Sequence, residues 1–111
     1  FVEQWEPYKS QFEISTKDSI EALINWMDTM ELSSFKTKTG IIIVPGFKFR
    51  IINRLITNFH QPQSTLLLLI SAFIGSDWRR VYEYALSNNF RFLSYGDSSI
   101  LTKNSSLNVI D

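Results

Sequence analysis

The sequence contains no cysteine and has only one histidine, four glycines and three prolines among its 111 residues. The absence of cysteine excludes disulfides, thiolate nucleophiles and thiolate metal sites, and it fits a reducing compartment, so we expect a cytoplasmic protein. With 44% hydrophobic and 20% charged residues, the composition is that of a globular protein and not of a disordered chain. This length is enough for one hydrophobic core, and we predict a single domain over 1–111.

The sequence also lacks a long hydrophobic run. Its most apolar stretch, Leu66 to Ile74, is well short of the roughly 20 residues that a membrane-spanning helix needs, so we predict no membrane contact and a buried core helix. The chain begins at Phe1, and no charged segment followed by an apolar one is found there. We therefore expect no signal peptide, and an internal start suggests a fragment of a longer protein.

Acidic residues are missing from a long central stretch. Residues 1–35 carry two basic and seven acidic side chains, whereas residues 36–76 have no acidic side chain and five basic ones, which are Lys36, Lys38, Lys48, Arg50 and Arg54. The net charge of zero conceals this asymmetry. Two interpretations remain open: the acidic and basic segments neutralise each other across the fold, or the basic segment faces phosphates.

The first half of the chain predicts one helix and two strands. Residues 1–14 show no clear period and are interpreted as an irregular lead-in. Ser15 or Thr16 then caps a helix that runs to about Met30, with Asp18 as a variant of the capping box and one apolar face made of Ile20, Leu23, Ile24 and Met27. The β-branched run 41–44 indicates a strand covered on both faces, and residues 47–52 indicate a strand whose solvated face carries Lys48 and Arg50.

The second half predicts two helices and a short strand. A strand-like run over 51–56 leads into a polar loop, after which a helix begins at Ser64 or Thr65 and ends at Gly75. A further helix is capped by Ser76 or Asp77, ends at Asn88-Asn89, and has an apolar stripe made of Trp78, Val81, Tyr82 and Leu86. A turn at 95–97 precedes a strand over 99–102, and the tail 104–111 is expected to fray. The fold class predicted is α/β, with a small mixed sheet and flanking helices.

His60 is the obvious candidate for acid–base chemistry, because its unperturbed pKa is the only one near neutrality. A lone histidine in a loop is also often structural, and no cluster of carboxylates accompanies it, so we expect no metal site. Hydroxyl and amide groups that could hold a ligand flank the loop, on Thr57, Asn58, Ser64 and Thr65. For Ser64, helix capping is the favoured interpretation.

The tetrapeptide Ser94-Tyr95-Gly96-Asp97 could bring a phenol and a carboxylate into a cleft, although the same residues make a good turn. No glycine-rich nucleotide-binding motif, phosphate-binding loop or nucleophile elbow is present. The residues by themselves therefore support an α/β domain with a polar loop, one histidine and a basic segment, and leave enzyme and binding module open.

Three stretches carry a resemblance to a known family: LITNFHQPQSTLLLLISAF at 55–73, FRFLSYGD at 90–97 and IIIVPGFKFRIIN at 41–53. They resemble the C-terminal part of the S-adenosylmethionine:tRNA ribosyltransferase-isomerase family. Its members are considerably longer than this chain, so the resemblance implies a C-terminal fragment of a larger two-domain enzyme, with the remainder of that parent chain as a partner. One departure is the loop's Gln61 and Gln63, where many relatives have leucine and lysine.

The resemblance implies a reaction in queuosine biosynthesis. In it, the ribosyl part of S-adenosylmethionine moves to 7-aminomethyl-7-deazaguanine at the tRNA wobble position and is isomerised, giving epoxyqueuosine with release of adenine and methionine. S-adenosylmethionine would be a consumed substrate, so no cofactor is expected, and tRNA would be the second partner. The isolated fragment would be inactive.

The same resemblance suggests roles for individual residues. His60 and Asp97 would be catalytic: His60 as the base that removes the proton beside the sulfonium or as a donor to departing adenine, and Asp97 as a group that orients the ribose or balances the sulfonium charge. Substrate binding would fall to Thr57, Asn58, Ser64, Thr65, Ser94, Tyr95 and Gly96, and anticodon-stem phosphates to Lys48, Arg50 and Arg54. The rival hypothesis is a non-catalytic RNA-binding module that uses the basic segment 36–54.

Overall fold

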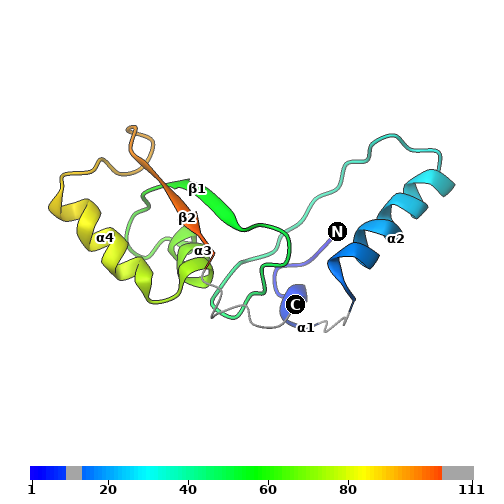
Figure 1. The fold of residues 1–111 in the computed structure, drawn as a ribbon, viewed down its shortest axis with the longest axis horizontal. Coiled ribbons are helices and arrows are strands. Elements are labelled where there is room, and N and C mark those ends of the chain that lie inside the picture. Colours follow the sequence, from blue (N-terminus) through cyan, green and yellow to red (C-terminus); the bar gives the residue numbers. More distant parts are fainter. Residues whose placement is uncertain (10–13, 104–111) are drawn as a thin grey trace. The chain divides into compact units, whose positions relative to one another are not determined.

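The computed structural model describes residues 1–9 and 14–103 (Figure 1). They form two compact units, one spanning residues 1–42 and the other beginning at Ile43, and each is described by itself. The predicted frayed tail, 104–111, and part of the predicted lead-in, 10–13, lie outside the described residues. The single domain over 1–111 stays a prediction. Of the helices described, none has the length and apolar character needed to cross a membrane.

The first unit contains two helices, α1 (Glu6–Lys9) and α2 (Thr16–Thr29). The single turn of α1 lies within the stretch that was expected to be irregular. The prediction for α2 is confirmed at its start, where the Ser15 side chain accepts a hydrogen bond from the Asp18 amide and satisfies one free N–H of the first turn. The Tyr8 hydroxyl donates to the Ile42 carbonyl at 2.7 Å and holds the two ends of this unit together.

The predicted apolar face of α2 is present in the sequence but is not buried in this unit. Ile20 and Ile24 are 43% and 50% exposed, and no residue among 1–9 and 14–42 is buried. Helix formation in α2 therefore rests on its cap and local propensity within the described chain, and not on a packed face.

The strands predicted over 41–44 and 47–52 are wrong, because neither segment pairs into a sheet. The first segment is half-buried, and the Ile42 amide donates to the Gln4 carbonyl at 3.0 Å. A turn at Pro45-Gly46 follows, with Gly46 at a φ of 105°. The alternation in the second segment does describe burial: Phe49 is 4% exposed, whereas Lys48 and Arg50 are exposed. The alternation of apolar and basic residues thus predicted which side chains point inward, although the segment is not paired with another strand.

The second unit is built on a two-stranded antiparallel sheet, β1 (Arg54–Asn58) and β2 (Ser98–Thr102). Leu55 pairs with Leu101 and Thr57 with Ser99, and these four residues are the less exposed positions of the two strands. The sheet therefore has one face toward the core and one toward solvent. The α/β fold class is confirmed, with a sheet smaller than the sequence suggested.

Helices α3 (Thr65–Ile74) and α4 (Asp77–Ser87) pack against each other, and α3 also contacts β2; in Figure 1 α3 lies at the lower end of β2 and α4 to the left of both strands. The predicted start and end of α3 are confirmed: Ser64 caps it, and Gly75 ends it with a φ of 66°. Helix α4 begins at Asp77, so Ser76 occupies the N-cap position, which is one of the two predicted caps. The Ser76 side chain makes no capping bond.

The hydrophobic core of this unit is aromatic at its centre. Phe73 and Ile70 are 0% exposed, and the Phe73 ring meets Phe49 edge-on at 4.9 Å. The prediction that Leu66 to Ile74 is core holds for its last turns only, since Leu66 remains 46% exposed. On α4 the residue buried with Tyr82 is Ala85, and the predicted Leu86 is 65% exposed. The predicted stripe is confirmed for Trp78, Val81 and Tyr82, which pack on the core, and is wrong only at Leu86.

Candidate functional site

His60 lies where β1 gives way to the loop that leads into α3, immediately after the buried Phe59. Its ring nitrogen Nε2 lies 2.6 Å from the Thr57 hydroxyl, and its backbone N–H donates to the Tyr82 hydroxyl at 3.0 Å. Tyr82 is a buried residue of α4, so the second contact fixes the loop backbone on the core. The histidine is therefore held by both its main chain and its ring.

The Thr57 hydroxyl has two partners. It lies 3.1 Å from the Asn58 carbonyl, to which it can donate its one hydrogen, and 2.6 Å from Nε2 of His60, toward which its role depends on the tautomer of the ring. Burial lowers the pKa of His60 from the ordinary value of 6.5, so the ring is neutral near neutral pH and one of its nitrogens has a lone pair that can accept a proton.

The other hydroxyl and amide candidates of this loop are not all brought to His60. Thr57 faces the core side of β1, whereas Asn58 is exposed on the opposite face, as the alternation of a strand requires. The Ser64 hydroxyl accepts a hydrogen bond from the Leu66 amide at 3.1 Å, so it caps α3 as expected. Thr65 is exposed in the first turn of that helix. Ligand contacts by Asn58, Ser64 and Thr65 stay predictions.

The segment 90–97 reaches the histidine loop through one backbone bond, from the Leu93 amide to the Phe59 carbonyl at 2.8 Å. Its carboxylate, Asp97, accepts hydrogen bonds from the Arg91 amide and, at 3.4 Å, from the Arg91 guanidinium. These bonds lower the pKa of Asp97 from its ordinary value of 3.8, the amide bond being the largest cause. Asp97 therefore closes its own loop, and no hydrogen bond or ion pair joins it to His60 within the described chain.

The remaining residues of that turn are open to solvent. Ser94 and Gly96 are exposed, and Tyr95 is exposed over 70% of its surface. Gly96 has a φ of 122°, and a Cβ at this position would meet the Arg91 guanidinium at 3.0 Å. The turn needs glycine here for its backbone conformation. The catalytic role of Asp97 and the substrate contacts of Ser94, Tyr95 and Gly96 stay predictions.

The three basic candidates do not share a strand face. Arg54 begins β1, whereas Lys48 and Arg50 lie in the loop before it, and all three are exposed. A further basic residue of the same region was not singled out from the sequence: the Lys103 ammonium donates to the Phe49 carbonyl at 3.0 Å and so is used within the fold. The described residues contain no group of three or more histidine and acidic side chains placed to hold a metal ion.

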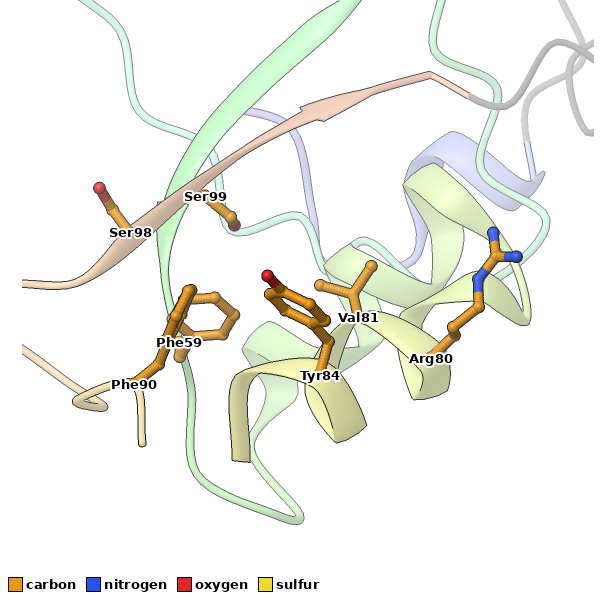
Figure 2. A pocket seen from close by; sticks show the side chains of 7 residues that line it. All are labelled: Phe59, Arg80, Val81, Tyr84, Phe90, Ser98 and Ser99. Carbon is orange, nitrogen blue, oxygen red and sulfur yellow. The ribbon is translucent and has the colours of Figure 1, made fainter. Parts of the chain in front are cut away.

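Sequence reasoning missed a pocket beside the histidine loop, which Figure 2 shows. It is an open hollow of ≈ 580 Å³ lined by Phe59, Arg80, Val81, Tyr84, Phe90, Ser98 and Ser99. These residues come from the end of β1, one side of α4, the segment after α4 and the start of β2. The only local signal for it was the spacing of Arg80, Val81 and Tyr84, which places them on one side of a helix.

Comparison with known proteins places the chain in a family. Residues 15–101, more than half of the chain, match the family model described as queuosine biosynthesis protein. The protein belongs to this family. The α/β unit and its histidine loop therefore belong to a known class of proteins, the queuosine biosynthesis proteins.

Individual relatives carry one name. A protein of Paraburkholderia phytofirmans named S-adenosylmethionine:tRNA ribosyltransferase-isomerase is 51% identical over 65% of this chain, and one of the same name from Azoarcus sp. is 51% identical over 66%. The matched segment spans only 21% of the length of each relative. The crystal structure of S-adenosylmethionine tRNA ribosyltransferase from Thermotoga maritima is 34% identical, with a TM-score of 0.56 over 73% of this chain and 30% of that one.

Proposed function

We propose that the chain is part of a tRNA-modifying transferase-isomerase. The reaction moves the ribosyl part of S-adenosylmethionine onto 7-aminomethyl-7-deazaguanine at the tRNA wobble position and gives epoxyqueuosine, adenine and methionine. The observation that supports it most is the family match over residues 15–101, together with relatives named for this type of transfer. S-adenosylmethionine is then a consumed substrate and tRNA the acceptor.

His60 is the group of this chain best suited to the proton transfer that the reaction needs. The sulfonium of S-adenosylmethionine acidifies the adjacent 5′ carbon, and a neutral imidazole can take a proton from it. In the proposed arrangement the Thr57 hydroxyl accepts a hydrogen from Nε2 of His60, which leaves Nδ1 to take the proton. The lowered pKa of His60 keeps this base unprotonated near neutral pH.

The test uses the natural polypeptide that carries this sequence, with S-adenosylmethionine radiolabelled in its ribose and tRNA bearing the precursor base. The expected result is transfer of label to tRNA by the wild type and a kcat reduced about 10²- to 10⁴-fold by His60→Ala, the usual contribution of a positioned acid or base. His60→Gln keeps the side chain polar but cannot take the proton, and should be equally impaired. Wild-type turnover by both variants would remove His60 from the chemistry.

A non-catalytic RNA-binding module is the second candidate, and the exposure of Lys48, Arg50 and Arg54 supports it. It would bind tRNA without transferring label, and its affinity would fall steeply as salt rises. Absence of binding at low salt would eliminate this candidate. Transfer of label to tRNA would decide for the enzyme.

A further inference from the structure

The pocket beside the histidine loop has exposed aromatic rings at its mouth. Tyr84 is 63% exposed and Phe90 37% exposed, and their rings meet edge-on with centroids 5.9 Å apart at 86°. Phe59, at the back of the pocket, lies 5.7 Å from Phe90. Figure 2 shows the Tyr84 ring rising from α4 toward β2, beside the Phe59 and Phe90 rings. An open hollow between such rings suits a flat, aromatic ligand.

Polar groups at the pocket's rim could orient a ligand that binds against the apolar rings. Ser98 and Ser99 lie on the β2 side and Arg80 on the α4 side (Figure 2). Among the described residues, the Tyr84 hydroxyl makes no hydrogen bond, so it can serve a ligand. The Arg80 guanidinium pairs with Asp77 at 3.2 Å, but both side chains are largely exposed, and a pair of this kind is weak enough for a phosphate to compete.

The pocket is joined to the proposed base through two residues. Phe59 immediately precedes His60 and places its own ring in the pocket. On the other strand, the Ser99 hydroxyl donates to the Thr57 carbonyl at 3.3 Å, and Thr57 in turn holds the His60 ring. His60 itself does not line the pocket, so a ligand seated against Phe59 and Ser99 is linked to the histidine through these two neighbours.

We propose that this pocket receives one unstacked nucleobase of an RNA substrate, with Arg80 on a neighbouring phosphate. This inference rests on the proposed function, and it specifies where the RNA is read. The base stacks on Tyr84 and Phe90, and the Ser99 hydroxyl, whose oxygen can still accept a hydrogen bond, meets its polar edge. The adenine of S-adenosylmethionine has the same flat chemistry, and the carboxylate of that molecule could meet Arg80, but the molecule as a whole is positively charged, so the position of Arg80 favours RNA with its phosphates.

The test measures binding of an RNA hairpin with the sequence of the anticodon stem and loop to the natural polypeptide, by fluorescence anisotropy. Tyr84→Ala should weaken binding roughly 5- to 150-fold, the range for loss of one stacked base, whereas Tyr84→Phe keeps the ring and the affinity. Arg80→Ala should reduce the slope of log K against log salt by about 0.7, as expected for one phosphate contact. Because Tyr84 is 63% exposed, its replacement leaves the core intact.

Leu86→Ala is the matched control, since Leu86 is 65% exposed on the same helix and does not line the pocket. It should leave RNA affinity unchanged. Calorimetric binding of S-adenosylmethionine to Tyr84→Ala separates the two flat ligands: loss of that affinity with RNA affinity intact would assign the pocket to adenine and overturn the proposal. Unchanged affinity for both would show that the pocket holds neither.

Ribose transfer by the wild type is measured in the same preparations. A wild type that binds the hairpin through Tyr84 but transfers no label would refute the proposed function and leave the pocket as an RNA site. Transfer of label together with Tyr84-independent RNA binding would refute the pocket alone. The two proposals therefore fail by different results.

Discussion

The Thr57 hydroxyl lies 2.6 Å from Nε2 of His60, a hydrogen bond that orients the ring, and in the proposed arrangement it accepts the ring hydrogen. Thr57→Val removes this acceptor while keeping the shape of the side chain. We expect kcat to fall by up to about tenfold, the worth of one hydrogen bond, with KM nearly unchanged. Thr57→Ser retains the hydroxyl and should retain the rate.

The pH profile of kcat shows whether Thr57 positions the His60 ring or only packs against it. An acceptor at Nε2 stabilises the protonated ring, so Thr57→Val should move the acidic limb of kcat to lower pH. Purely structural damage would lower kcat at every pH without moving the limb. That second pattern would rule out the tautomer assignment.

His60 also predicts a pH dependence of stability. Burial lowers the folded-state pKa of His60 below 6.5, so on acidification the unfolded chain takes up a proton before the folded one does. The contribution of His60 is fully present above pH 6.5 and is lost as pH falls toward the folded-state pKa. Urea unfolding between about pH 5 and about pH 8 measures it. His60→Gln should flatten this part of the curve, and an unchanged slope would contradict the lowered pKa.

Asp97 accepts from both the amide and the guanidinium of Arg91, so loop closure and catalysis can be separated by two substitutions. Asp97→Asn keeps an oxygen for the Arg91 amide but removes the charge, whereas Asp97→Ala removes both. Hydrogen exchange at the Arg91 amide should accelerate about tenfold in the alanine variant only, since one hydrogen bond is lost. If the charge serves the reaction, kcat falls in both variants. Wild-type kcat in Asp97→Asn would restrict Asp97 to closing the loop.

Helix limits could be predicted from the sequence because their causes are local. Ser64 before an apolar run and Gly75 after it fixed α3, and Ser15 fixed the start of α2. The run 41–44 failed as a strand because a β-branched sequence sets an extended preference but cannot supply the neighbouring strand. Burial on α4 shifted from Leu86 to Ala85 because packing against α3, and not periodicity alone, selects the buried face.

The candidate site likewise has a part that could be predicted from the sequence and a part that could not. His60 and its loop were found from residue type and position, and Thr57 from its place beside the loop. The pocket was missed because its residues come together only when Ser98 and Ser99 of β2 pair beside β1 and α4 brings Tyr84 to them. The bond between Leu93 and Phe59 that ties the two loops is likewise between backbone atoms, and side-chain patterns carry no signal for it.

Ser64 and Ser76 each precede a helix, but only Ser64 makes a capping hydrogen bond. Substitutions at the two positions therefore form a matched pair. The Ser64 hydroxyl accepts from the Leu66 amide, whereas Ser76 makes no side-chain capping bond. Ser64→Ala should lower the free energy of unfolding by about 1 kcal/mol, the usual worth of an N-cap. Ser76→Ala should change it by less than about 0.5 kcal/mol. Equal losses in the two variants, measured by urea unfolding, would contradict the capping assignment.

Phe73 and Leu66 lie on the same helix and test where the core begins. Phe73 is 0% exposed and packs edge-on against Phe49, whereas Leu66 is 46% exposed in the first turn of α3. Phe73→Ala should cost about 3–5 kcal/mol through lost burial and the cavity left behind. Leu66→Ala should cost about 1 kcal/mol or less, because a half-exposed leucine gives up little burial. If the two costs were similar, Leu66 would be buried in the natural polypeptide, covered by chain beyond the residues described.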